Sequence, residues 1–336
     1  MGALMTKFQA FRVHQENDEV VGRVEDITVD DLDEGDVLIK TAYSAVNYKD
    51  ALAGTGAGKI LRHFPCNAGV DVSGTVVESQ DKRLKEGDSV LITGYEFGVD
   101  HDGGFSEYVR VPAEWVVPVP NSMSLFEAMA IGTAGFTVAL CVQRLEDNNQ
   151  TPDLGQFIVT GASGGVGSIA VDILSSLGYE VVALTGKSNS NDLLTSIGAS
   201  HVLDRNTLKL DGPPLEKGQW GGAIDNVGGD ILAWLTKTTN PWGNIAAVGL
   251  AGGFKLNTTV MPFILRGVSL LGINSQGCPT HFRHHLWERL ASDLAPKHLN
   301  KIVTNTVGLE DLPSVFDNML AGKTTGRTVV AIDPNE

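Results

Sequence analysis

The segment from Phe157 to Ala170 constrains the fold more than any other part of the sequence. It reads FIVTGASGGVGSIA, an apolar run followed by a glycine-rich turn and then by apolar residues at helical spacing. In the frame Ala162-x-Gly164-x-x-Gly167, small residues permit a tight turn, bring backbone N–H groups close to a pyrophosphate and let the helix pack on the strand. This order predicts a dinucleotide-binding site. A purely structural glycine turn is the alternative.

The order of predicted strands and helices divides the chain into two parts. From about residue 126, a helix over 126–140 leads to alternating elements, with strands expected over 157–160, 181–184, 201–203, 222–225, 245–248 and 268–272. Such alternation predicts an α/β unit with a parallel, doubly wound sheet. The first 125 residues predict a folded-over β-barrel, with strands at 37–43, 69–78, 88–93, 109–112 and 115–120. A His- and Arg-rich helix, a strand near 302–303, a helix near 312–320 and a strand over 327–332 follow residue 275.

Length and charge limit the functions open to the chain. Its 336 residues suggest two domains, and its net charge of −15 argues against nucleic acid and against an anionic membrane surface as partners. No apolar run approaches the roughly 18 residues needed to cross a bilayer, and residues 1–10 lack the apolar segment of a signal peptide, so we expect a cytoplasmic protein. Cys66, Cys141 and Cys278 lie far apart, which argues against a disulfide framework and against a zinc site of cysteines alone.

The end of the second predicted strand indicates which cofactor is preferred. A site for NAD usually places Asp or Glu about 20 residues after the glycine turn, where it binds the ribose hydroxyls. Here the strand ends in Thr185-Gly186-Lys187-Ser188, which offers hydroxyls and an ammonium group and no carboxylate to repel a 2′-phosphate. Arg205, after the third strand, can add a second positive charge. The sequence therefore predicts NADPH as the cofactor, although a solvated loop lysine is the alternative for Lys187 alone.

Several long blocks resemble one protein family nearly from end to end. The chain resembles the zinc-independent, quinone oxidoreductase-like branch of the medium-chain dehydrogenase/reductases, and within it the YhdH/YhfP group, which includes acryloyl-CoA reductases. The blocks are SAVNYKDAL at 44–52, GVDVSGTV at 69–76, IGTAGFT at 131–137, 159–167, GLAGG at 249–253, TVMPFILRG at 259–267 and Gly326-Arg327.

The resemblance implies a fold, a domain division and an assembly. It implies a GroES-like β-barrel catalytic domain over 1–125, completed by 276–336, and a Rossmann-type NADPH-binding domain over 126–275. It also implies a homodimer in which the strand near 268–272 extends the sheet across the interface.

The resemblance also implies the site residues. Catalytic roles fall to Tyr48 and Asn47 beside the nicotinamide, with Asp71 and Arg327 nearby, either as an orienting pair or as a plain salt bridge between domains. Thr133 would face the carboxamide. At the phosphates, the cofactor-binding residues would be Ser163, Gly164, Gly165, Val166, Thr185, Gly186, Lys187 and Arg205. At the nicotinamide they would be Leu250, Ile264 and Ser275, together with Tyr48 and Arg327.

Two stretches depart from the pattern of the family. Relatives often carry a tryptophan before the paired glycines where this chain reads Asp102-Gly103-Gly104, and many read Asp-Ser-Val where it has Asn274 to Cys278. Both stretches are candidates for the border of the substrate pocket, so the substrate is the least secure part of the resemblance.

Zinc is not expected in this chain. Zinc-dependent relatives place a cysteine near Asn47 and a His-Glu pair near Gly69, whereas Cys66 and Asp71 offer at most two ligands here, and a catalytic zinc needs about three. His281, His284 and His285 share one Arg-rich helix, where solvated histidines are the simpler interpretation.

Without a Lewis acid, a conjugated acceptor is easier to reduce than a plain carbonyl. We therefore expect NADPH-dependent reduction of acryloyl-CoA or a similar short enoyl thioester at its β-carbon. The alternatives are two-electron reduction of quinones, an NADPH-binding protein with little catalysis or with affinity for RNA, and a generic zinc alcohol dehydrogenase. Lys59, Arg62, Lys82 and Arg83 are candidate contacts for CoA phosphates, with solvated surface cations as the alternative.

Overall fold

The computed structural model describes residues 7–333, which fall into two compact units. Residues 1–6, part of the segment used above to argue against a signal peptide, lie outside the described residues. Unit 1 consists of Met1–Thr133, Gln276–Ala291 and Val303–Glu336, and unit 2 of Ala134–Ser275 and Ser292–Ile302. The first boundary therefore lies a little later than the predicted 125/126, and part of the C-terminal region predicted for the catalytic domain belongs to unit 2.

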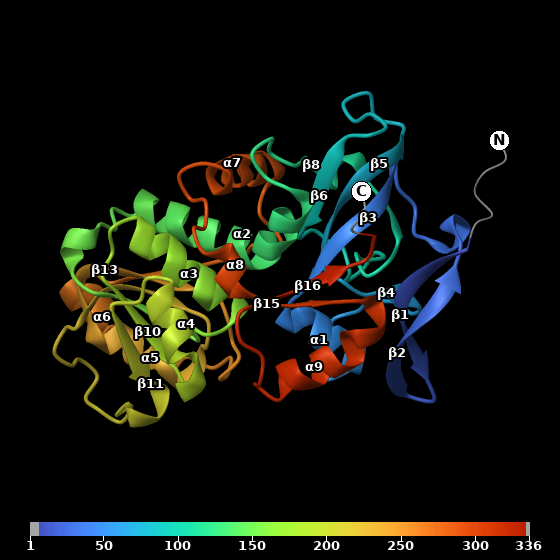
Figure 1. Cartoon of the computed structure of the whole chain (residues 1–336). Coiled ribbons are helices and arrows are strands. Elements are labelled where there is room, and N and C mark those ends of the chain that lie inside the picture. The colour runs from blue at the N-terminus through green and yellow to red at the C-terminus, as the bar shows by residue number, and fades with distance from the viewer. Residues whose placement is uncertain (1–6, 334–336) are drawn as a thin grey trace. The chain divides into compact units, whose positions relative to one another are not determined.

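Unit 1 is mostly β-structure (Figure 1). Its strands and helices are β1 (Phe8–Glu16), β2 (Glu19–Ile27), β3 (Val37–Val46), α1 (Tyr48–Thr55), β4 (Cys66–Asn67), β5 (Asp71–Ser79), β6 (Ser89–Thr93), β7 (Tyr108–Val111), β8 (Val117–Pro118), the start of α2 (Leu125–Asp147), α7 (Thr280–Leu290), β15 (Val303–Val307), α9 (Leu312–Leu320) and β16 (Arg327–Ala331). One sheet has the order β15-β16-β3-β5-β6-β8, with β7 also paired to β3, and a smaller sheet has the order β2-β1-β4.

The central strand β3 explains why this unit closes on itself. It pairs antiparallel with β16, β5 and β7, and breaks in its register with β5 allow the sheet to bend. Its alternating side chains Val37 and Ile39 lie in a buried cluster with Val72 and Ile92 of β5 and β6. The predicted strands at 37–43, 69–78 and 88–93 are thus present.

Four elements of this unit, β1, β2, α1 and β4, had no specific prediction. Helix α1 is short, and the β1–β2 hairpin has few alternating apolar residues on its exposed side. The hairpin turns at Asn17 and Asp18, both with positive φ, in the two-residue geometry that matches the twist of paired strands. The predicted strand at 115–120 shrinks to the two residues of β8.

Unit 2 is built around a parallel sheet. Its strands and helices are the rest of α2, β9 (Phe157–Thr160), α3 (Gly165–Ser176), β10 (Val181–Thr185), α4 (Asn191–Ser196), β11 (His201–Asp204), β12 (Trp220–Asp225), α5 (Gly229–Thr238), β13 (Thr239–Ala247), α6 (Met261–Arg266), β14 (Ser269–Gly272) and α8 (Leu299–Ile302). The order β11-β10-β9-β12-β13-β14 is the doubly wound order, in which the chain starts in the middle and winds outward to both edges. Ile158, Val182 and Ile245 lie in its buried core.

Helix α2 is longer than the predicted 126–140 and contains a break. Its backbone leaves the helical region at Gly132, so that two helical pieces meet there. By length and composition alone it could cross a membrane, which the sequence analysis did not anticipate. Of its most apolar stretch, 78% is buried inside the fold, as expected for a core helix.

Candidate functional site

A buried carboxylate, Asp71, organises a polar cluster in unit 1. The side chain of Asp71 is fully buried at the start of β5. Its Oδ2 accepts hydrogen bonds from Asn47 Nδ2 at 2.8 Å and from the backbone N–H of Thr133 at 2.9 Å, while its Oδ1 accepts from Thr133 Oγ1 at 2.5 Å. Arg327 Nη2 lies 3.7 Å from Oδ2. Four of the predicted site residues thus meet within one unit.

Arg327, at the start of β16, is buried and bonded to protein groups through all three nitrogens. Its Nη1 donates to Asn47 Oδ1 at 3.0 Å, and its Nε and Nη2 donate to the carbonyl oxygens of Ala130 and Met129. Burial lowers the pKa of Arg327, and the nearby charge of Asp71 opposes that shift. The amide of Asn47 is therefore held at both ends, its nitrogen by Asp71 and its oxygen by Arg327.

Two of these residues, Asp71 and Arg327, are buried among protein groups to which they are hydrogen-bonded. Asp71 and Arg327 expose almost nothing to solvent, and their hydrogen bonds fix Asn47 and Thr133, while their predicted roles beside substrate or cofactor stay predictions. They lie in the same unit, so the alternative of a salt bridge between domains is wrong.

The break in α2 makes the cluster possible. Gly132 has φ 48° and ψ −155°, a conformation that other residues rarely adopt. A β-carbon there would lie 2.5 Å from Asp71 Oδ2 and 2.7 Å from Arg327 Nη2. Glycine at this position therefore turns the N–H of Thr133 toward Asp71 and leaves room for the ion pair.

A second buried carboxylate, Asp50, fixes the start of α1. It accepts hydrogen bonds from the backbone N–H groups of Asn47 at 2.7 Å and Val70 at 3.0 Å. Burial, reinforced by the negative charge of Asp71, raises the pKa of Asp50 to about 7. Tyr48, which lies in the sequence between the hydrogen-bonded residues Asn47 and Asp50, is 45% exposed, so its ring and hydroxyl are accessible to a ligand.

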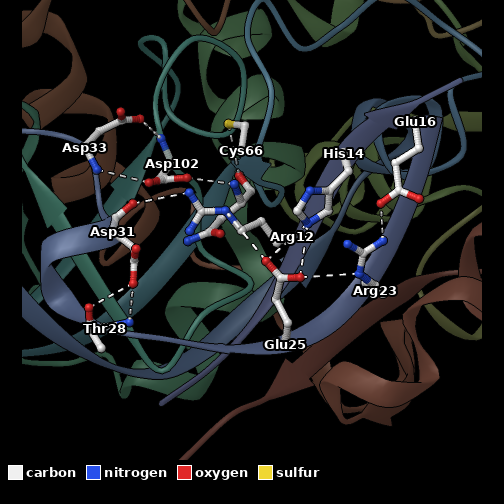
Figure 2. Close-up of polar contacts among 11 residues, drawn as sticks. Arg12, His14, Glu16, Arg23, Glu25, Thr28, Asp31, Asp33, Cys66 and Asp102 are labelled. Carbon is white, nitrogen blue, oxygen red and sulfur yellow. Dashed lines mark hydrogen bonds and ion pairs between the residues drawn. The ribbon is translucent and has the colours of Figure 1, made fainter. Parts of the chain in front are cut away.

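The loop with the paired glycines is anchored by Asp102. This carboxylate is buried and accepts hydrogen bonds from the backbone N–H groups of Asn67 at 2.7 Å and Asp33 at 3.0 Å. In turn, the side chain of Asp33 accepts a hydrogen bond from the backbone N–H of Asp102 (Figure 2). The glycines that follow pass close to the backbone at Gly69 and Asp71, where a β-carbon would collide with carbonyl oxygens. Asp102 therefore has a structural role at the position where relatives often carry a tryptophan.

The glycine turn in unit 2 has the geometry expected of a phosphate cradle. Gly161 has a positive φ of 58°, and a β-carbon on Gly167 would lie 2.3 Å from the Gly161 carbonyl oxygen. Among the described residues, no side chain caps the start of α3 at Gly164. The N–H groups of the first turn, where the helix dipole is positive, can therefore bind an anion.

The end of β10 supplies hydroxyls and cations next to this turn. Ser163 and Thr185 share a hydrogen bond of 2.9 Å, and the N–H of Lys187 donates to Thr185 Oγ1 at 3.1 Å. A β-carbon on Gly186 would lie 3.2 Å from Arg205 Nη2, so the guanidinium lies against the backbone of this loop. Partial burial lowers the pKa of the Lys187 ammonium. Unit 2 thus brings together the residues predicted for the adenosine phosphate.

The first strand of the sheet, β9, lies at its switch point, between β10 and β12. The buried Asp225 at the end of β12 accepts hydrogen bonds from Thr160 Oγ1 at 2.6 Å and from the N–H of Gly228 at 2.8 Å. These bonds tie the carboxyl ends of two neighbouring strands together, where ligands of doubly wound sheets bind. Asp225 was not among the predicted site residues, although an Asp directly after the apolar residues of a predicted strand is a usable signal.

The residues predicted for the nicotinamide side are less constrained. Leu250 is 63% exposed and Ile264, on α6, is 71% exposed, while Ser275 is partly buried at the end of unit 2. Their role next to the cofactor stays a prediction.

The candidate metal ligands do not form a donor set. Burial raises the pKa of the Cys66 thiol, which favours the protonated form, and Asp71 already accepts three hydrogen bonds. Among residues 7–333, no group of three or more His, Cys, Asp or Glu side chains is placed to hold a metal ion.

Two of the four cations suggested for CoA phosphates have carboxylate partners. Arg62 forms ion pairs with Glu96 and Asp100, each at 3.2 Å, and Arg83 forms one with Asp81 at 2.6 Å. These pairs favour the structural interpretation of both arginines.

Comparisons with known proteins match both units. Residues 33–121 match the alcohol dehydrogenase GroES-like domain, and residues 165–292 match the zinc-binding dehydrogenase domain. Together these domains define a dehydrogenase of the alcohol dehydrogenase type.

Individual relatives match almost from end to end. The chain is 49% identical to a Bacillus subtilis protein named "Putative quinone oxidoreductase YhfP", over 98% of this chain and 100% of the relative. It is 43% identical to the acrylyl-CoA reductase AcuI of Ruegeria pomeroyi, over 95% and 97% of the two chains. The YhdH oxidoreductase of Salmonella enterica, solved with NADP, is 45% identical with a TM-score of 0.93, over 96% and 99%. The structure of Bacillus subtilis YhfP has a TM-score of 0.94, over 97% and 99%, and holds NAD.

The chain therefore belongs to the medium-chain dehydrogenase/reductase family, within the quinone oxidoreductase-like group of YhdH and YhfP. The predicted fold class of a GroES-like domain with a Rossmann-type sheet is confirmed, as is the prediction of a nicotinamide-dependent oxidoreductase.

Proposed function

We propose that this enzyme uses NADPH to reduce acryloyl-CoA or a similar short enoyl thioester. The observation that carries the proposal is the phosphate cradle at the start of α3 together with Lys187 and Arg205 at its side. Two positive charges, and the lack of a carboxylate among residues 185–188 at the end of β10, favour an adenosine that carries a 2′-phosphate. Acrylyl-CoA reductases among the relatives at 43–44% identity, and NADP in the YhdH structure, support the same conclusion.

The roles of the residues follow from which groups are fixed and which are exposed. When bound, NADPH supplies a hydride. The Asn47 amide, held by Asp71 and Arg327, would present a fixed polar surface to the substrate. Tyr48, exposed beside it, would position the substrate and pass a proton to the α-carbon, directly or through water.

The proposed chemistry proceeds without zinc. The stretches where zinc-dependent relatives place their ligands offer Cys66, whose raised pKa keeps it protonated, and Asp71, whose oxygens are taken by protein donors. A conjugated acceptor suits such a site, because the charge that develops on its oxygen can be stabilised by hydrogen-bond donors. Elemental analysis of the purified enzyme should show no stoichiometric zinc.

Reduction of quinones is the second candidate, and the name of the Bacillus subtilis relative favours it. It would use the same cofactor site with a less selective substrate pocket. The two candidates differ in the expected ratio of kcat/KM for acryloyl-CoA and for a benzoquinone.

One panel of assays tests the proposal. NADPH oxidation is followed with acryloyl-CoA, longer enoyl thioesters, a benzoquinone and a simple aldehyde. We expect the highest kcat/KM with a short enoyl thioester. A higher value with the quinone would favour the second candidate, whereas tight NADPH binding without turnover of any acceptor would make the chain a cofactor-binding protein with little catalysis.

We further propose a homodimer and a cytoplasmic location. Strand β14 is an edge strand of the sheet in unit 2, and exposed apolar side chains of the same unit include Trp242, Phe254, Ile264 and Leu265. A second copy of the chain can pair with this edge and cover exposed apolar side chains. Sedimentation should give a dimer that Leu265→Lys weakens, and a monomeric wild type would contradict the assembly. Cell fractionation tests the location.

A further inference from the structure

Lys49 follows Tyr48 in the first turn of α1. Its side chain is half-buried, and its Nζ donates to Gln276 Oε1 at 2.5 Å. The partner is a neutral amide from a segment that precedes α7. The first turn of α1 thus carries an exposed phenol and, at the next position, a half-buried ammonium group.

The partner of Lys49 is held in place by its backbone. The carbonyl oxygen of Gln276 accepts hydrogen bonds from the N–H of Tyr95 at 3.0 Å and from Arg283 Nη2 at 3.1 Å. Arg283 is fully buried, donates to the carbonyl oxygen of Thr93 at 2.7 Å, and lies 4.5 Å from the centre of the Tyr95 ring. The Gln276 side chain therefore reaches Lys49 from a fixed position.

The charge of Lys49 is not neutralised by a direct partner. In the described part of the chain, no carboxylate lies within ion-pair distance of its Nζ, although Asp50, Glu96 and Asp71 act on it from farther away. Asp50 and Asp71 are both committed to other donors. Burial lowers the pKa of Lys49 more than these carboxylates raise it. A desolvated ammonium without an ion partner is well suited to an oxygen that gains negative charge.

We infer that Lys49 is the electrophilic residue of the reaction. Its ammonium group would exchange the hydrogen bond to Gln276 for one that it donates to the acyl oxygen of the substrate. This inference rests on the proposed function. As the hydride forms a C–H bond at the β-carbon, the C=C electrons move to the α-carbon and the acyl oxygen, giving an enolate beside the ammonium. NADPH is oxidised and the acceptor is reduced. Lys49 keeps its proton, and the α-carbon receives one through Tyr48 or water.

Two variants and a matched control separate this role from simpler ones. Lys49→Gln removes the charge, and Lys49→Arg keeps a cation with a higher pKa. Lys85→Gln is the control, because Lys85 is an exposed lysine of the same unit that has no predicted contact with substrate or cofactor. A third variant, Gln276→Glu, keeps the length of the partner and gives Lys49 a carboxylate.

The assays use the full-length enzyme and whichever of acryloyl-CoA or benzoquinone the wild type reduces. We expect Lys49→Gln to lower kcat by about 10²-fold, the usual effect of removing one oxyanion donor, with KM and NADPH affinity little changed. Wild-type kcat/KM should fall at alkaline pH as Lys49 loses its proton, at a pKa below the ordinary lysine value. Lys49→Arg should recover most of the rate and lose that alkaline decline.

Gln276→Glu should lower kcat and move the alkaline decline to higher pH, because a carboxylate stabilises the charged ammonium. Lys85→Gln should behave as wild type, and unchanged NADPH affinity in each variant shows that it has folded.

Specific results would overturn the inference. The first is a Lys49→Gln enzyme with wild-type kcat. The second is a Lys49→Gln enzyme in which only KM rises, as expected for a lysine that binds CoA phosphates. The third is a Lys49→Arg enzyme whose kcat/KM declines at the same alkaline pH as that of wild type. Failure of the proposed function shows separately, in a wild-type enzyme that reduces no enoyl thioester.

Discussion

Around Asp71 in unit 1, charged and amide side chains are hydrogen-bonded to one another, so few of their polar atoms remain for a ligand. At the β9–α3 turn of unit 2, by contrast, glycines leave backbone N–H groups uncovered. In the first site, the hydrogen bonds among the polar groups fix the orientation of Asn47 and the position of the adjacent Tyr48. The second presents polar groups directly to an anion. The comparison teaches that substitutions at the first should act mainly on folding and kcat, and those at the second on cofactor affinity.

Gly132→Ala should have the largest effect. The new β-carbon would require positive φ and would overlap Asp71 and Arg327, so we expect loss of the cluster and several kcal/mol of stability, beyond the 1–3 kcal/mol typical of strain alone. Chemical denaturation measures the loss. Gly87→Ala is the matched control in unit 1, since Gly87 also has positive φ but has nothing within 4 Å of the new carbon. Equal losses in the two variants would show that backbone strain alone decides the outcome.

Replacing one buried aspartate in each unit sharpens the comparison. Asp71→Asn leaves Arg327 without its buried counter-charge, which typically costs about 3–5 kcal/mol. Asp225→Asn removes a carboxylate bonded to a hydroxyl and to N–H groups, for which about 1–3 kcal/mol is typical. Denaturation and NADPH titration of both proteins should show that Asp71→Asn is less stable yet binds NADPH normally. Weaker NADPH binding in Asp71→Asn would break the division of roles.

Removing the two cations of unit 2 should change cofactor preference without unfolding the protein. Lys187→Ala and Arg205→Ala each remove a charge-assisted contact worth about 1.5–3 kcal/mol, or about 10- to 100-fold in affinity for NADPH. Affinity for NADH should stay nearly constant, because it lacks the 2′-phosphate. A parallel loss for both cofactors would show that these residues support the loop and do not read the phosphate.

The smallest expected effect concerns pH. The pKa of Asp50 is raised from its ordinary value to about 7 in the folded state, so the folded protein binds more protons than the unfolded chain between these values. The stability that Asp50 contributes is therefore present at acidic pH and is lost as pH rises toward about 7. Between about pH 5 and pH 7, we expect wild type to lose roughly 2 kcal/mol relative to Asp50→Asn. A difference that is constant with pH would contradict this.

The sequence made unit 2 easier to predict than unit 1 because its signals are local. Strand, glycine turn and helix follow one another within Phe157–Ala170, and Lys187 lies just after the next strand. In unit 1, Asn47, Asp71 and Arg327 are brought together only by the pairing of β3, β5 and β16, so only the family resemblance could nominate them.

The remaining features depend on contacts that no local pattern announces. The role of Gly132 depends on Asp71 and Arg327 being beside it, that of Asp102 on the backbone at Asp33, and that of Lys49 on Gln276.

The most direct test of the account is the affinity of the wild-type enzyme for NADPH and for NADH, measured side by side by fluorescence titration at equal ionic strength. The account predicts that NADPH binds at least about 10-fold more tightly, the gain expected from one charge-assisted contact. The Bacillus subtilis relative was solved with NAD, so the measurement separates this chain's preference from the cofactor in that structure. Equal binding, or tighter binding of NADH, would contradict the role given to Lys187 and Arg205 and the function built on it.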